Sequence, residues 1–207
     1  MYIPKHFSAP SQEDILTTIS TAGASDLITH DGGEFQVTSL PFLFETDGSD
    51  HGSLLGHVAR ANPHWQSVDG SQGLVIMRGP SAYVSPSVYP SKKEHQKVVP
   101  TWNYVAVHLV GKIFVHEETP WLRDVVTRLT DHFEAVSTQP WSVSDAPEEF
   151  IESQLRAIVG IEFVITRIEA KYKLSQNRVK ADAEAVRCDM YRRSELAMYK
   201  AMDWVEG

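Results

Sequence analysis

The pattern of apolar and polar positions along the chain predicts short strands in the first half and helices afterwards. Apolar runs at 27–30 and 34–44 flank Asp31-Gly32-Gly33, which is typical of a hairpin with a glycine turn. Further strand-like runs are 53–59, 74–78 closed by Gly79-Pro80, 82–85, 104–115 with a bulge or turn at Gly111-Lys112, and 161–174. Antiparallel strands at short spacing with glycine-rich turns predict a small barrel or sandwich.

Helices are expected in five places. Residues 11–22 form a short amphipathic run, Asn62-Pro63 fits a cap and first turn, and Thr119-Pro120 opens a helix to about 136. Later helices are expected from Pro147 to about Gly160, and from about Val179 to Trp204. The predicted class is therefore mainly β with peripheral helices.

The amino-acid composition limits the kinds of partner that we expect the protein to bind. The net charge of -8 disfavours broad, non-specific phosphate binding, although residues 167–200 hold nine Lys or Arg against five Asp or Glu. One cysteine, Cys188, excludes an internal disulfide and a cysteine zinc site, and we expect it to be packed in a helix. Because no apolar run approaches a membrane span and the first residues lack a signal core, we expect no membrane partner and a cytoplasmic protein by default.

Familiar catalytic and phosphate-binding motifs are missing from the sequence. We find no HExxH, GxSxG, GxxxxGK or GxGxxG, so we expect no metal site and name no catalytic residue. His51 and His57 are interpreted as scattered polar histidines in preference to metal ligands.

Cationic, hydroxyl and aromatic side chains gather in four short sets, and residues 83–104 are the richest stretch, with three prolines in what we expect to be a rigid loop. The candidate ligand-binding residues are His57, Arg60 and Asn62; Ser85, Tyr89 and Lys92; Thr101, Trp102 and Asn103; and Lys173, Ser175, Gln176 and Asn177. Each set has a plainer interpretation: an exposed strand-end arginine, a solvated basic turn, ordinary aromatic packing, or a helix cap by Ser175 or Asn177. Their co-occurrence favours a planar, anionic ligand.

The blocks MYIPKHF, GHVARANPHW, YVSPSVYPSKKEHQKVVPTWNY and KYKLSQNR together resemble the PaiB-like FMN-binding negative transcriptional regulators. The resemblance implies an antiparallel Greek-key split β-barrel of the pyridoxamine-phosphate-oxidase type, with FMN bound at a homodimer interface. It covers residues 1–178 as one domain and leaves 179–207 as a C-terminal helical extension. The four sets above fall on the family's blocks, and we expect Arg60 and Lys92 at the flavin phosphate and Thr101 to Asn103 near the ring.

Two functions follow from this resemblance. The first is a flavin-binding protein of the split-barrel class, with oxidoreductase or flavin reductase activity as the alternative to a direct regulatory role. The second is a regulator that contacts DNA or a protein partner, which the basic segment 167–200 motivates and the negative net charge weakens. No general acid or base stands out, as is common where a cofactor carries the chemistry.

Overall fold

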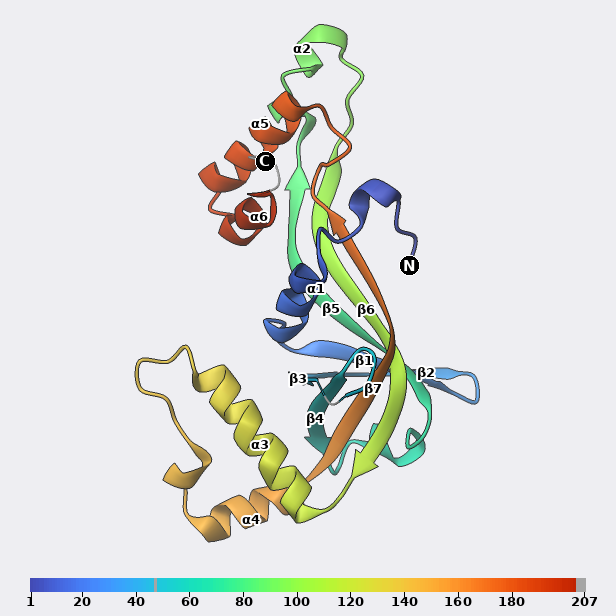
Figure 1. The fold of residues 1–207 in the computed structure, drawn as a ribbon, viewed down its shortest axis with the longest axis vertical. Helices are drawn as coiled ribbons and strands as arrows, with labels where there is room; N and C mark the ends of the chain where they lie inside the picture. The colour runs from blue at the N-terminus through green and yellow to red at the C-terminus, as the bar shows by residue number, and fades with distance from the viewer. Residues whose placement is uncertain (47, 204–207) are drawn as a thin grey trace. The chain divides into compact units, whose positions relative to one another are not determined.

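The computed structural model describes residues 1–46 and 48–203 and contains one seven-stranded sheet with the strand order β2-β1-β5-β6-β7-β4-β3 (Figure 1). The strands are β1 (Ser25–Asp31), β2 (Glu34–Leu40), β3 (Leu43–Glu45), β4 (Ser53–Ala59), β5 (Gln72–Val84), β6 (Thr101–His116) and β7 (Ile158–Lys173). The helices are α1 (Gln12–Ser20), α2 (Lys92–His95), α3 (Thr119–Glu134), α4 (Glu148–Arg156), α5 (Lys180–Arg192) and α6 (Leu196–Ala201). The predicted mainly-β class with peripheral helices is confirmed.

The chain divides into two compact units. Unit 1 comprises Met1–Thr18, Arg78–Val107 and Glu169–Gly207, and unit 2 comprises Ile19–Met77 and His108–Ile168. The long strands β5, β6 and β7 each contribute residues to both units. None of the helices in the described residues is long and apolar enough to cross a membrane.

Unit 2 contains the hairpin that the glycine turn predicted. β1 pairs antiparallel with β2 from Ser25↔Leu40 to Asp31↔Glu34, so the turn is the two-residue Gly32-Gly33, both at positive φ. The periodicity predicts an apolar face of Leu122, Val125, Val126 and Leu129 on α3, and the helix buries all of these except Val126, which is half-buried. Val125 and Leu129 pack with Leu55 of β4, which fixes the helix on the sheet.

Two predicted boundaries were wrong because glycines inside strands were taken for the ends of elements. β5 runs unbroken through Gly79-Pro80, which was expected to close a strand, and β7 already starts at Ile158, before Gly160, which was expected to end a helix. A Cβ on Gly160 would lie 2.1 Å from the Trp121 ring, and one on Gly79 would lie 2.8 Å from Val105 Cβ. These glycines therefore allow close packing and do not end the elements.

The C-terminal region also differs from its prediction. The expected single helix is two, α5 and α6, because Ser194 adopts a left-handed φ of 61° between them. Cys188, expected to be packed, is exposed on α5. Trp204, the predicted helix end, lies outside the described residues. The expected rigid loop 83–104 is shortened by strand residues at both ends and contains α2.

A buried histidine ties the hairpin of unit 2 to the turn that follows β4. His64 is 4% exposed, and its ring nitrogens meet Thr29 Oγ1 at 2.7 Å and Thr38 Oγ1 at 2.8 Å. Asn62 caps the same turn, accepting from the His64 amide at 3.0 Å, as the Asn62-Pro63 pair predicted. Burial lowers the pKa of His64 below the ordinary 6.5.

This environment predicts acid sensitivity of unit 2. The folded state binds a proton less tightly than the unfolded state, so the contribution of His64 is complete above about pH 6.5 and declines as the pH falls toward the folded pKa. The free energy of unfolding should fall there by at most about 1.4 kcal/mol per pH unit for this group. Urea titrations at several pH values measure the slope. His64→Gln should flatten it and His51→Gln, at an exposed site, should not; an equal slope in both variants would contradict the assignment.

Candidate functional site

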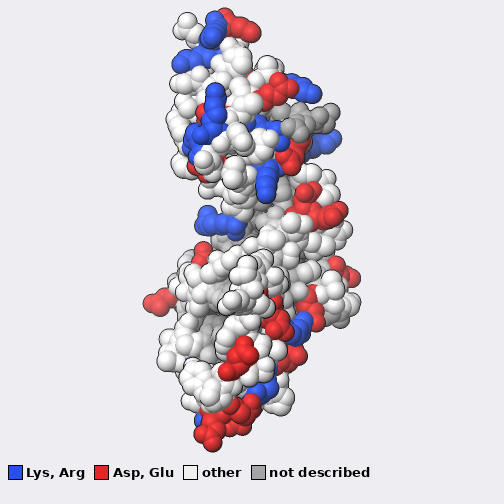
Figure 2. All heavy atoms as spheres, turned by 90° about the vertical axis from the view of Figure 1, so that its left-hand side faces the viewer, with Lys and Arg blue, Asp and Glu red and all other residues white. Residues whose placement is uncertain are grey.

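The charged side chains are unequally divided between the two units. Unit 1 contains thirteen Lys and Arg against ten Asp and Glu, whereas unit 2 contains six against seventeen. On the face shown in Figure 2, basic side chains gather over α2, α5 and α6, and acidic side chains predominate over α3 and α4. An anionic ligand is therefore better matched electrostatically by unit 1.

Three cationic side chains of unit 1 lie close enough to affect one another, namely Lys171, Lys173 and Arg178, and we call them the cationic cluster. Lys171 and Lys173 alternate with buried Tyr172 on β7, so strand geometry places both on one face. Among the described residues, no carboxylate lies within ion-pair distance of any of the three. The cluster therefore has positive charge available for a ligand.

Aromatic rings hold these cations. Lys171 Nζ lies 5.5 Å from the centroid of Tyr104, 5.7 Å from that of Tyr2 and 6.0 Å from that of Phe7. Lys173 Nζ lies 6.0 Å from the Phe7 and Tyr104 centroids. Rings attract a cation through their quadrupole without neutralising its charge, so they position the ammonium groups for an anion.

Lys173 is also fixed by β6. Its Nζ donates to Thr101 Oγ1 at 2.5 Å and to the carbonyl oxygen of Trp102. Burial, then Lys171 and Arg178, lower the pKa of Lys173 below its usual range. An anion beside Lys173 would reverse this effect, because an opposite charge favours the ammonium form. An anion would therefore be a favourable neighbour of the Lys173 ammonium group.

The segment between β5 and β6 is attached to the same region through Arg178 and α5. The Arg178 guanidinium lies 4.7 Å from the Tyr89 ring centroid, and Tyr89 is buried with its hydroxyl unpaired within the described chain. Ser91 donates from its amide and its hydroxyl to the Asp182 carboxylate, at 3.1 and 2.6 Å. Asp182 is only 3% exposed, so this pair fastens the segment to the first turn of α5.

Removing that carboxylate should release the segment. Asp182→Ala leaves two Ser91 donors buried without partners, which we expect to cost about 2 kcal/mol. Limited proteolysis should then cut residues 85–100 faster than in the wild type. Glu184→Ala, at an exposed position of the same helix, is the control. An unchanged cleavage rate in Asp182→Ala would show that other contacts hold the segment.

Several predicted site residues are brought together by the β6–β7 pairing. Thr101, Trp102 and Lys173 share the hydrogen bonds given above. Asn103 is fully buried, and its Oδ1 accepts from Ser175 Oγ at 3.1 Å. Ser175 has a left-handed φ of 68°, so this contact supports a strained turn.

The other predicted residues of unit 1 have local partners or lie at the surface. Gln176 accepts from the Leu174 amide at 2.7 Å and donates to the Tyr172 carbonyl at 2.6 Å, which closes the turn after β7. The N-cap of α5 is Val179, so the alternative that Ser175 or Asn177 caps this helix was wrong. Ser85 accepts from the Ser87 amide, and Asn177 and Lys92 are exposed, Lys92 on α2.

His57, Arg60 and Asn62 belong to unit 2. The Arg60 guanidinium donates to Glu117 at 2.5 Å and to the carbonyls of Arg156 and Ile158 at 3.0 and 3.1 Å. These bonds clamp the start of β7, so Arg60 has a structural role within its own unit. Asn62 acts as the cap described above. His57 Nδ1 is buried without a described partner, and burial lowers the pKa of His57.

Two members of the cationic cluster were missing from the predicted site residues. Lys171 could have been found from the alternation Lys171-Tyr172-Lys173 at the end of a predicted strand. Arg178 ends the KLSQNR block, but its contact with Tyr89 joins residues far apart in sequence and has no local signal.

The chain matches one family model and several known proteins. Residues 1–167 match a family model described as "Putative FMN-binding domain". The chain is 34% identical over 183 residues to the protease synthase and sporulation protein PAI 2 of Bacillus subtilis, covering 88% of this chain and 85% of the relative. It is 31% identical over 170 residues to an uncharacterized protein of Saccharomyces cerevisiae, covering 72% and 100%.

Solved structures show the same fold at low identity. The FAD and heme binding protein from Mycobacterium smegmatis superimposes with a TM-score of 0.59 at 17% identity, covering 80% of this chain and 72% of that protein. A conserved hypothetical protein from Mycobacterium tuberculosis gives 0.58 at 12% identity, covering 86% and 94%. The expected split-barrel fold is confirmed.

Proposed function

Because the chain belongs to the FMN-binding domain family and is related to PAI 2, we propose that it binds FMN with the flavin phosphate at the cationic cluster of unit 1. The observation that carries the location is the group of three cations, Lys171, Lys173 and Arg178, placed beside aromatic rings without a described carboxylate partner. A phosphate dianion offers acceptor oxygens to all three.

The residues of unit 1 also suit the flat ring of a flavin. The Trp102 side chain is 55% exposed. The residue before it, Thr101, contacts Lys173 through its hydroxyl, so Trp102 directly follows a residue that touches the cationic cluster. Tyr83 meets the indole edge at a centroid distance of 5.9 Å and an angle of 68°, which holds the exposed ring in place. An exposed, braced indole is suited to stacking on a heteroaromatic ring. FMN, when bound, would supply electron-transfer chemistry, and the chain's own residues would hold and orient it.

The contacts of Arg60 favour a structural role over the phosphate-binding role expected from the resemblance. Three of its donor groups already meet Glu117 and two carbonyls, so a phosphate would have to compete with them. Lys92 remains a candidate phosphate ligand on the exposed helix α2.

Flavin binding at this site is tested by titrating FMN against the full chain and following flavin fluorescence and absorbance. Saturable quenching by FMN, with weaker binding of riboflavin, is expected because riboflavin lacks the phosphate. Equal affinities for the two ligands would show that the cationic cluster does not bind the flavin phosphate. The absence of any spectral change would remove flavin binding altogether.

We further propose a homodimer, with flavin held at the interface. Unit 1 exposes large apolar side chains, among them Tyr2 at 82% and Val99 at 64%, that a second copy would cover. Light scattering during size-exclusion chromatography measures the mass. A monomer at all concentrations, in the presence of FMN, would contradict this proposal.

We also propose a regulatory role, which could be direct or indirect, and an experiment can separate the two. Direct contact with DNA is favoured by the positive balance of unit 1, whereas the flavin-enzyme alternative makes any regulatory effect indirect. Duplex anisotropy at low and moderate salt distinguishes them: a salt-dependent shift supports contact. No shift at low salt, together with flavin-dependent turnover of NADH or NADPH, supports the enzyme.

A further inference from the structure

The N-terminal segment, residues 1–8, lies beside the part of β7 that carries the cationic cluster (Figure 1). Ser8 forms an antiparallel bridge with Lys171, and the ammonium group of Met1 contacts the Glu169 carboxylate. The segment is therefore attached near both of its ends to the strand that carries two of the three cations.

Two aromatic rings of this segment lie near the cations but differ in exposure. Phe7 is 6% exposed, and its ring centroid lies 6.0 Å from both Lys171 Nζ and Lys173 Nζ. Tyr2 is 82% exposed, although its ring centroid lies 5.7 Å from Lys171 Nζ. Removing apolar surface from water is favourable, so a ligand that binds the cation gains free energy if it also covers the Tyr2 ring.

The distance between Tyr2 and Lys171 suits a ligand that joins an anion to an organic group. An oxygen that accepts a hydrogen bond from Lys171 lies about 3 Å from its Nζ, so the group attached to the anion comes next to the Tyr2 ring. Inorganic phosphate carries no such group and would leave the ring exposed. Riboflavin has the organic group but lacks the anion that would hold it beside Lys171.

We propose that the N-terminal segment forms one wall of the flavin site, with Tyr2 in contact with the organic part of the ligand. This inference rests on the proposed binding of FMN at the cationic cluster. Because the ligand contacts Tyr2 only while the segment is attached to β7, binding and attachment stabilise each other. FMN gains from the cations and from the ring together, whereas inorganic phosphate gains from the cations alone.

Cleavage by trypsin after Lys5 measures whether the segment is attached, because Lys5 is exposed and lies between the two attachment points. The full chain is digested briefly with FMN, riboflavin or inorganic phosphate present, and mass spectrometry measures the loss of residues 1–5. Saturating FMN should slow this cleavage about tenfold, because cleavage requires the detached segment and binding stabilises the attached one. Riboflavin and inorganic phosphate should slow it by about twofold or less.

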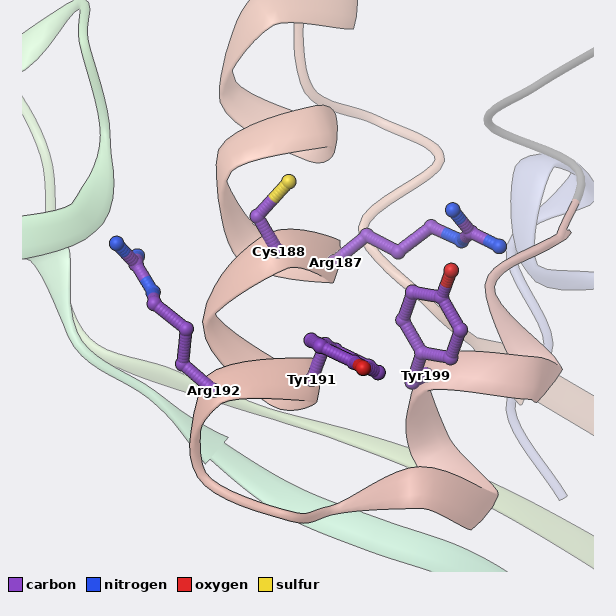
Figure 3. A pocket seen from close by; sticks show the side chains of 5 residues that line it. All are labelled: Arg187, Cys188, Tyr191, Arg192 and Tyr199. Carbon is purple, nitrogen blue, oxygen red and sulfur yellow. The ribbon is translucent and has the colours of Figure 1, made fainter.

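Two substitutions at Tyr2 test the contact with the ring. Tyr2→Ala should weaken FMN binding about fivefold, and Tyr2→Phe should bind FMN as the wild type does, because it keeps the ring. Tyr191→Ala is the matched control and should leave the affinity unchanged. Tyr191 is also an exposed tyrosine, but it lies on α5, where its ring is 5.3 Å from that of Tyr199 on α6 (Figure 3).

The results distinguish failure of this inference from failure of the proposed function. The absence of any spectral change with FMN contradicts both. Normal FMN binding with unchanged cleavage after Lys5, or with the wild-type affinity in Tyr2→Ala, overturns the role of the segment and leaves the flavin site in place. Light scattering of the digestion samples is the last measurement: if protection follows the mass of the particle and not the occupancy by FMN, a second copy covers Tyr2 and the inference is wrong.

Discussion

Lys173→Met should lower the affinity for FMN by about 10- to 100-fold, because one charge-assisted hydrogen bond to a phosphate is worth about 1.5–3 kcal/mol. Lys173 is the member of the cationic cluster held by both β6 and the aromatic rings, so its ammonium position is the best defined. Methionine keeps the unbranched apolar stem and removes the charge. Fluorescence titration with FMN measures the loss.

Riboflavin separates a phosphate contact from damage to the fold. The affinity for riboflavin should change little in Lys173→Met, so the preference for FMN should largely disappear. Lys180→Met, at the exposed first position of α5, is the matched control and should bind both ligands as the wild type does. Equal losses of affinity for FMN and riboflavin would show that Lys173 maintains the shape of the turn after β7 and does not contact the phosphate.

The part of the fold that could be predicted was encoded in local signals. Gly32-Gly33 can adopt the positive φ of a tight turn, and the spacing of Leu122, Val125 and Leu129 defines one helix face, so both elements were found. The cap at Asn62 was found for the same reason, since its partner is the amide of His64 two residues later.

The site was less predictable because its contacts are long-range. Arg60 is paired with Glu117, fifty-seven residues later in the chain, and nothing near Arg60 in sequence indicates that partner. Arg178 follows β7 and Tyr89 follows β5, so their contact depends on β5, β6 and β7 being neighbours in the sheet. Residue types in and beside the proline-rich segment therefore indicated the class of ligand, while the proposal of one group of cations over another depends on tertiary contacts.

Glycines within strands show that prediction of the fold is limited in the same way as prediction of the site. A glycine that ends a strand and a glycine that allows a close approach look identical in sequence, and only the neighbouring element distinguishes them. A Cβ on Gly111 would lie 2.4 Å from the Val164 carbonyl oxygen and 2.6 Å from Phe163 Cε1. Phe163 is fully buried, so neither neighbour can move aside without disturbing the pairing of β6 with β7.

Gly111→Ala should therefore destabilise unit 2 by about 3 kcal/mol, the upper part of the usual range for overpacking. Thermal unfolding followed by far-UV circular dichroism should show a midpoint lowered by roughly 10 °C. Gly23→Ala is the control: its Cβ would meet nothing within 4 Å, so the free energy of unfolding should change by no more than about 0.5 kcal/mol. If Gly111→Ala unfolds at the wild-type temperature, β6 does not approach Val164 and Phe163 as closely at Gly111 as the structure has it. The continuity of β6 is what carries Thr101 and Trp102 into unit 1 on the same strand that packs against Phe163 in unit 2.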